Sequence, residues 1–159
     1  MNVKNILISF VNPNYQQGPV ECNAFYLPYS SGVLWAYIQQ FDHLSHVKLG
    51  KFVWRRDNVD QVASELAQSD IVGFSNYIWN KNYNYTLAKR VRELNPQALI
   101  IFGGPEVPVS KKDIFEKYPF IDLVAIQEGE LSFCAILENY QESYSHIPGL
   151  LINDNTKVI

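Results

Sequence analysis

Five short apolar runs, each followed by a stretch with helical character, constrain the fold of this chain more than any other feature. The runs are apolar throughout rather than alternating, which is typical of strands buried on both faces of a parallel sheet. The regular alternation of strand and helix predicts an α/β fold, an open, doubly wound, five-stranded parallel sheet with helices on both faces. We expect the strands over residues Asn5–Val11, Val47–Trp54, Asp70–Ser75, Ala98–Phe102 and Ile121–Ile126.

Helix signals fill the intervals between these runs. Ser30 or Ser31 can cap the first helix and Asn58 the second. The Asn95-Pro96 pair ends the third, because proline cannot continue a helix. Residues 12–28 form a long first connection, and a loop of this length is usually functional. We expect helices from Ser30 or Ser31 onward and over Val59–Ala67, Lys81–Leu94, Lys111–Tyr118 and Glu130–Tyr140.

Composition excludes several classes of protein. The formal net charge is −3 and no Lys/Arg run dominates, which argues against a primary role in nucleic-acid binding. The first ten residues are not a signal peptide, and no window approaches the ~20 apolar residues of a membrane span. Cys22 and Cys134 are far apart and belong to no CxxC or Cys/His cluster, which makes a zinc site improbable. We therefore expect a cytoplasmic protein without a membrane or nucleic-acid partner.

In open parallel sheets, ligands bind outside the carboxyl ends of the strands. The segments that follow the expected strands are rich in glycine, proline, small polar groups and aromatics. The three histidines, His43, His46 and His146, are expected away from these strand ends, which disfavours hydrolytic triads. Neither GxGxxG nor GxxxxGK[ST] is present, so classical nucleotide loops are excluded.

The segments LPYSSGVLWAYI, DIVGFSNYIWN, LAKRVRELNPQALIIFGGPEVP, IDLVAIQEGELSF and IPGLLIND follow one another in the order and spacing of one family. Over residues 3–152 the chain resembles the N-terminal cobalamin-binding domain of B12-dependent radical S-adenosylmethionine (SAM) enzymes. The resemblance implies a Rossmann-like, or flavodoxin-like, sheet with strand order 2-1-3-4-5. It also implies that cobalamin lies across the carboxyl edge, with its dimethylbenzimidazole tail inserted into the sheet.

The resemblance carries over to particular positions. It implies that Ser75 hydrogen-bonds the tail and that Gly103 and Gly104 let the tail pass close to the backbone. On this basis a bulky residue at position 104 is expected to block the tail and leave the fold intact. The implied cofactor-binding residues are Asn12, Pro13, Tyr15, Ser75, Asn76, Tyr77, Gly103, Gly104, Pro105, Glu106, Gln127, Glu128, Gly129 and Glu130.

Two family features are missing from this sequence. The DxHxxG motif after the first strand is absent, so a cobalt–histidine bond from that loop is impossible. The CxxxCxxC motif that holds a [4Fe-4S] cluster is also absent, so the cluster and SAM are expected only in a downstream domain. Residues 1–146 are expected to form the cobalamin-binding-like domain, and residues 147–159 a hairpin (Leu150–Ile152 with Lys157–Ile159) or the start of a linker. The chain is then either an excised domain or a stand-alone module.

By itself the chain is expected to bind cobalamin rather than to catalyse, within a parent enzyme of the methyltransferase type. The alternative is a B12-binding-like fold that does not bind cobalamin and serves as a protein- or substrate-interaction module. Tyr15, Tyr77 and Trp79 would then fill the groove, although Tyr77 and Trp79 could also stack on the macrocycle. A response-regulator-like module is discounted, because the paired acids and the lysine that it needs are missing.

Simpler structural explanations exist for three further features. A plain turn with positive φ would explain Gly103-Gly104. Glu130 lies in the first turn of an expected helix, where a carboxylate is favoured by the helix dipole, and this leaves Glu128 to face a ligand. The basic residues Lys89, Arg90 and Arg92 are expected to form a solvated helix face.

Overall fold

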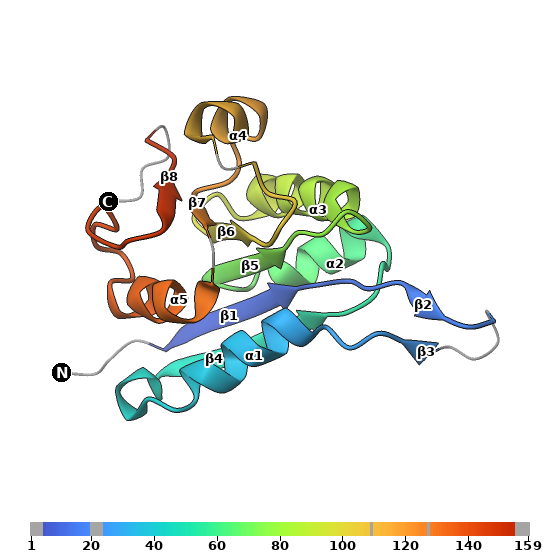
Figure 1. Ribbon diagram of the computed structural model, residues 1–159, viewed down its shortest axis with the longest axis horizontal. Coiled ribbons are helices and arrows are strands. Elements are labelled where there is room, and N and C mark those ends of the chain that lie inside the picture. The colour runs from blue at the N-terminus through green and yellow to red at the C-terminus, as the bar shows by residue number, and fades with distance from the viewer. Residues whose placement is uncertain (1–4, 20–23, 109, 127, 155–159) are drawn as a thin grey trace.

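Six strands form the central sheet of the computed structural model, which describes residues 5–19, 24–108, 110–126 and 128–154. The sheet order is β4-β1-β5-β6-β7-β8, and the first five strands are parallel (Figure 1). The predicted doubly wound sheet and its strand order 2-1-3-4-5 are thereby confirmed. The strands are β1 (Ile6–Val11), β4 (Val47–Val53), β5 (Ile71–Ser75), β6 (Leu99–Gly103), β7 (Leu123–Ala125) and β8 (Leu150–Ile152).

The sixth strand adds to the expected five. Leu150–Ile152 pairs antiparallel with β7 and so joins the main sheet. The Asn153 side chain ties the end of this strand down, because its amide donates to the Ile121 carbonyl at 2.8 Å. Residues 157–159, the expected hairpin partner of this strand, lie outside the described residues.

Helices cover both faces of the sheet. Helices α1 and α5 lie on one face and α2 and α3 on the other, as Figure 1 shows. Helix α4 contributes buried side chains to the same core as α2 and α3. No helix within the described residues is both long and apolar enough to cross a bilayer. The helices are α1 (Tyr29–Ile38), α2 (Val59–Leu66), α3 (Lys81–Leu94), α4 (Lys111–Lys117) and α5 (Gly129–Glu138), with a 3-10 turn η2 (Asp42–Leu44).

One predicted cap is confirmed and another is wrong. The Asn58 side chain accepts a hydrogen bond from the Gln61 backbone N–H at 3.1 Å, as an N-cap should. Helix α1 instead begins at Tyr29 with Pro28 in the cap position and without a side-chain cap. The Ser30 hydroxyl is thereby left to make a different hydrogen bond, described below.

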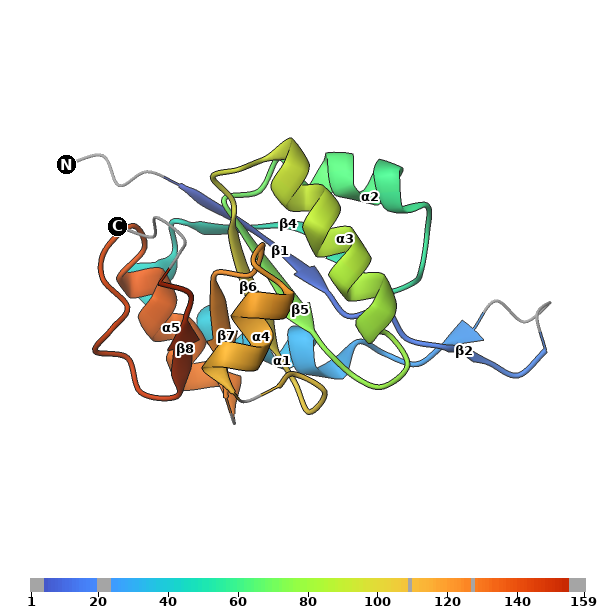
Figure 2. The same cartoon turned by 90° about the horizontal axis from the view of Figure 1, so that it is seen from above.

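The long connection after β1 contains a short β-ribbon that the sequence did not predict. Strands β2 (Gln16–Gln17) and β3 (Ala24–Phe25) pair antiparallel and form a second, separate sheet. Figures 1 and 2 show this ribbon projecting from the body of the domain, beyond the carboxyl end of β1. Tyr15 and Tyr26 pack against each other at its base, with ring centroids 4.8 Å apart.

The basic residues of α3 do not form one solvated face. The Arg90 side chain is 40% exposed and pairs with Asp60 and Glu93, but the Arg92 side chain is only 21% exposed. Arg92 forms an ion pair with Asp122 and donates to the backbone carbonyls of Ala98 and Phe120. The Asp122 carboxylate also accepts from the Ile100 N–H at 2.7 Å. Arg92 therefore joins α3 to the amino-terminal ends of β6 and β7.

Replacing Arg92 with alanine should lower the free energy of unfolding by about 2 kcal/mol, because it removes the guanidinium group that pairs with the buried Asp122 carboxylate. Urea denaturation followed by circular dichroism measures the change. Arg90→Ala, on the same helix, is the matched control and should leave the urea midpoint nearly unchanged, since its ion pairs are exposed. Equal losses for the two variants would contradict this account of Arg92.

Candidate functional site

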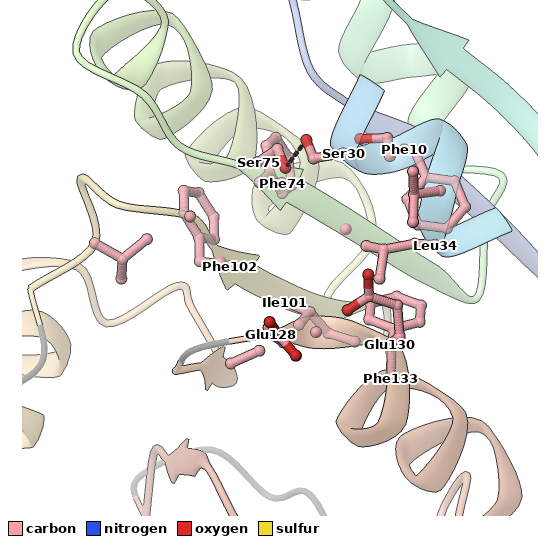
Figure 3. Close-up of a pocket in the computed structure, with 18 of the residues that line it drawn as sticks. Phe10, Ser30, Leu34, Phe74, Ser75, Ile101, Phe102, Glu128, Glu130 and Phe133 are labelled. Atoms are coloured by element: carbon pink, nitrogen blue, oxygen red, sulfur yellow. Dashed lines mark hydrogen bonds between the residues drawn. The ribbon is translucent and has the colours of Figure 1, made fainter. Parts of the chain in front are cut away.

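A cavity of about 600 Å³ lies at the carboxyl ends of β5, β6 and β7. Residues from the first half of α1 and the first turns of α5 form its other walls (Figure 3). The walls are mainly apolar, and Phe10, Leu34, Ile101 and Phe133 are among the residues that line it. A cavity of this size, with an apolar lining and a few polar groups, is typical of a small-molecule or cofactor site.

Small residues on neighbouring strands open this cavity. Ser75 on β5 is directly paired with Gly103 on β6. Ala125 on β7 lies beside Gly103, and its Cβ is 3.9 Å from the place where a Cβ of residue 103 would be. All three residues line the cavity. Side chains alternate between the faces of a strand, so a larger residue in this row would project toward α1 and α5.

Gly103 and Gly104 differ in whether the backbone conformation and the local packing require a glycine. A Cβ on Gly103 would meet only ordinary contacts, the nearest at 3.7 Å, so the local packing does not require glycine there. Gly104 has φ = +99°, and a Cβ on it would lie 2.5 Å from the Asn76 carbonyl oxygen. The expectation that a bulky residue at 104 would leave the fold intact is therefore wrong, because the turn itself requires this glycine.

The Ser75 hydroxyl already has a hydrogen-bond partner within the chain. It shares a hydrogen bond of 2.9 Å with the Ser30 hydroxyl on α1, and both serines line the cavity. Asn12, which follows β1, donates from its side-chain amide to the same Ser30 oxygen at 2.9 Å. Three segments that are far apart in sequence thus meet in one short hydrogen-bonded chain beside the cavity, and Figure 3 shows its bond between Ser30 and Ser75.

Asn80, at the N-cap of α3, and Asn84, within α3, hold the loops around the site. Asn80 and Asn84 both donate to the Ser75 carbonyl at 3.0 Å, and Asn80 also donates to the Pro13 carbonyl at 3.2 Å. The buried Asn76 accepts from Asn84 at 2.8 Å. Asn76 and Pro13 therefore support the site and do not line the cavity. The sequence did not predict the roles of Asn80 and Asn84. A signal was present, because the two lie four residues apart on the same helix face as the buried residues Leu87, Ala88 and Val91.

The Glu-Gly-Glu segment lies at the start of α5, as expected. Glu128 occupies the N-cap position without a capping hydrogen bond, and Glu130 lies in the first turn. Both carboxylates and Gly129 line the cavity, and neither glutamate forms an ion pair with a described residue. Figure 3 shows Glu128 across the cavity from the two serines. Gln127 lies outside the described residues.

The remaining predicted residues divide between the rim and the outside. Pro105 and Tyr77 line the cavity, whereas the Glu106 carboxylate forms an ion pair of 2.7 Å with Lys81. The Tyr77 ring is stacked on Trp79 at 4.7 Å, and Tyr15 packs edge-on against Trp79 at 5.5 Å. Tyr15 and Trp79 are not among the cavity-lining residues, so these two rings do not fill the cavity.

An aromatic stack supports the far side of the site. Phe102, a cavity residue, is stacked between Phe74 at 4.7 Å and Tyr85 at 5.3 Å. Tyr85 continues onto Tyr118 at 3.8 Å. Burial, with a smaller contribution from Tyr118, raises the pKa of Tyr85 to about 12, so its hydroxyl stays neutral at physiological pH. The stack is an apolar, uncharged support for the wall.

No cluster of three or more His, Cys, Asp or Glu side chains among the described residues is placed to hold a metal ion. Cys134 on α5 is buried, and burial, together with the Glu138 carboxylate, raises the pKa of its thiol to about 11. His43 pairs with Glu138 at 2.6 Å, and none of the described cavity residues is a histidine. The described residues of the cavity offer apolar surface and hydrogen-bonding groups to a ligand.

Replacing Gly104 with alanine should destabilise the fold by about 1–3 kcal/mol, because a side chain at positive φ is strained and its Cβ collides with the Asn76 backbone. Gly103→Ala is the matched control and should change stability by less than about 0.5 kcal/mol. Thermal unfolding of the two variants measures the difference. Equal melting temperatures for both variants would show that the turn does not require glycine at 104.

Comparison with known proteins bears directly on this cavity. The sequence profile described as "B12 binding domain" matches residues 44–137. The chain is 29% identical over 138 residues to the cobalamin-dependent radical SAM methyltransferase TokK of Streptomyces tokunonensis. It is 28% identical over 138 residues to the 2-(S-pantetheinyl)-carbapenam-3-carboxylate methyltransferase of Streptantibioticus cattleyicolor.

Each of these two alignments covers 84% of this chain and 20% of the relative. An uncharacterized methyltransferase of Pyrococcus horikoshii is 31% identical over 91 residues, which is 56% of this chain and 20% of the relative. The chain thus spans about one fifth of the length of the curated relatives it matches. Since the profile covers more than half of the chain, this chain belongs to the B12 binding domain family.

Proposed function

We propose that this chain binds cobalamin at the carboxyl edge of its sheet, as the cobalamin-binding part of a radical SAM enzyme of the methyltransferase type. The observation that carries the proposal is the cavity between the sheet and helices α1 and α5. It lies at the strand ends where ligands of open parallel sheets bind. Membership of the B12 binding domain family supports cobalamin as the ligand.

The residues of the cavity fit the benzimidazole tail of cobalamin. Gly103 and Ala125 leave space above the sheet, and local packing does not explain the glycine. Phe10, Leu34 and Phe133 supply apolar surface to a flat aromatic group. Ser30 and Ser75 supply hydroxyls at the wall. An apolar cavity with so few polar groups binds by burial and orients by hydrogen bonding.

The rim of the cavity is the part that we assign to the corrin. Tyr29, Pro105 and Glu128 line the cavity and are solvent-exposed, and Tyr77 is half-buried. The proposal assigns the tail to the interior and the larger ring to this rim. It assigns no protein ligand to the cobalt.

When bound, cobalamin would supply a methyl group carried on cobalt, and this chain's residues would bind and orient the cofactor. In this proposal a [4Fe-4S] cluster and SAM belong to a separate domain that follows β8, which makes that domain the partner of this one. The relatives described as cobalamin-dependent or as methyltransferases motivate this assignment. We place the whole enzyme in the cytoplasm, without a nucleic-acid or membrane partner.

The competing interaction-module hypothesis requires a filled groove. Tyr15 and Trp79, two of the residues that would fill it, lie outside the cavity lining, and Tyr77 lies at its wall. The open volume of about 600 Å³ therefore favours the cofactor over the interaction module.

Gly103→Val should weaken cobalamin binding by at least about tenfold, because the added methyl groups occupy the cavity. The purified chain is mixed with hydroxocobalamin, and the corrin absorbance that co-elutes in gel filtration is titrated. Gly32→Val is the matched control: its site on α1 is exposed and outside the cavity lining, with nothing within 4 Å of an added Cβ. A colourless unmodified chain after gel filtration would refute the proposed function.

The assignment of a radical SAM parent has its own test. Sequencing of the coding region downstream of the codon for Ile159 should reveal a CxxxCxxC motif in the same reading frame. A stop codon directly after Ile159 in the native gene would contradict this part of the proposal and leave the binding of cobalamin to be judged by the titration.

A further inference from the structure

The inner end of the cavity is formed by a row of residues across three neighbouring strands. Phe10 on β1 is paired with Gly73 on β5, and Gly73 is paired with Ile101 on β6. Gly73 and Ile101 come two residues before Ser75 and Gly103, so this row faces the same side of the sheet, one step further from the strand ends. All three residues of the row line the cavity, and Figure 3 shows Phe10 and Ile101 among its side chains.

Phe133 on α5 completes this inner end from the helix side. A Cβ on Gly73 would lie 3.3 Å from Cδ1 of Phe10 and 3.4 Å from Cζ of Phe133. The two phenyl rings pack against each other with centroids 5.6 Å apart, and the two residues are 1% and 3% exposed. The missing side chain at position 73 thus gives both rings room. We call Phe10, Gly73, Ile101 and Phe133 the floor of the cavity.

The floor offers no polar side chain to a ligand. The backbone groups of its three strand residues lie within the β1–β5 and β5–β6 ladders, where parallel strands pair their N–H and C=O groups. The polar lining residues belong instead to strand ends, loops and the first turns of α1 and α5, which begin beside the strand ends. They are residues 29–31, Ser75, Tyr77, Glu128 and Glu130.

We propose that the floor selects corrinoids by the base at the end of the nucleotide tail, and that it takes an alkylated benzimidazole in preference to a purine. The inference rests on the proposed function and deepens it, because it names the class of cobalamin-like cofactor that the site takes. Dimethylbenzimidazole carries two methyl groups on its outer edge, whereas adenine carries ring nitrogens and an amino group. Phe10, Ile101 and Phe133 are the specificity-determining residues.

Two physical effects produce this selection. Burial of apolar groups against an apolar floor is favourable, and each methyl group contributes about fourfold to affinity. A polar group that is buried without a partner is costly, because it loses its hydrogen bonds to water and gains none. Benzimidazole without methyl groups and adenine are bicyclic rings of equal size, so a comparison of these two bases separates polarity from shape.

The test compares the affinities of the purified chain for hydroxocobalamin and for its two analogues with unsubstituted benzimidazole or adenine as the lower base. All three are titrated by corrin absorbance. The benzimidazole analogue should bind about tenfold more weakly than hydroxocobalamin, because the two methyl contacts are lost. The adenine analogue should bind at least about tenfold more weakly again, because its polar edge meets the floor.

Ile101→Thr and Ile101→Val form a matched pair of variants, because threonine and valine have nearly the same shape and differ by one hydroxyl. Relative to Ile101→Val, Ile101→Thr should shift the affinity ratio at least about fivefold toward the adenine analogue, since the hydroxyl gives the base a partner. The cost of releasing a base from cobalt is the same for both variants, so the shift reports the cavity alone.

A second pair of variants makes the same comparison from a helix and keeps the test decisive if a hydroxyl on β6 prevents folding. Leu34 lies on the second turn of α1 and lines the cavity. Leu34→Gln adds polar groups there, and Leu34→Met is its apolar control of similar length. The affinity ratio should shift in the same direction as for the first pair. Circular dichroism establishes which variants are folded.

The outcomes distinguish this inference from the function on which it rests. If the unmodified chain binds none of the three corrinoids, the proposed function fails. If it binds the adenine analogue as tightly as hydroxocobalamin, the floor does not select the base, and the cobalamin site stands. Affinity ratios that are equal within each pair of folded variants would also overturn the inference and leave the proposed function in place.

Discussion

The close passage of the turn after β6 beside the loop after β5 is the contact on which the site depends. The Asn76 N–H donates to the Gly103 carbonyl at 2.7 Å, and the Asn76 carbonyl accepts from the Glu106 N–H at 3.3 Å. Only a residue without a Cβ fits at position 104. Because these two loops are held against each other, the ends of β5 and β6 form one continuous wall. Gly103 and Ser75 stay in register on that wall and face the same cavity.

The cavity follows from a change in side-chain size along the strands. Toward the amino ends, the face under α1 and α5 carries Ile71, Leu99 and Leu123, which are all buried. Toward the carboxyl ends the side chains on this face become small, while the helices continue above them. Helices α1 and α5 are in contact here, since a Leu34 methyl group lies 3.3 Å from the place of a Cβ on Gly129. The core leaves this space unfilled, and a cavity of this kind is typical of ligand sites.

The sequence predicted what depends on local pattern. Continuous apolar runs predicted the five parallel strands, and the resemblance predicted their order. The bounds of α3, from Lys81 to Leu94, were also predicted correctly. The β-ribbon in the first loop was missed, since strands of two residues carry too little pattern to be recognised. A strand at Leu150–Ile152 was expected as part of a hairpin, but its antiparallel pairing with β7 was not. The resemblance drew attention to Ser75 and the glycine pair, and the structure places all three residues in the cavity lining.

What the sequence could not predict is pairing between distant residues. Ser30 and Ser75 are 45 positions apart, and Asn12 and Ser30 are 18 apart, so no local spacing indicates that their side chains meet. The same holds for Arg92, whose charge suggested a solvated face until the fold placed Asp122 against it. Both contacts satisfy partly buried polar groups, which would lower stability if they were left without a partner. The Ser30–Ser75 bond joins the start of α1 to the end of β5, and the Arg92–Asp122 pair joins α3 to the start of β7. These links hold helices on both faces of the sheet in place, and the first of them fixes one wall of the cavity.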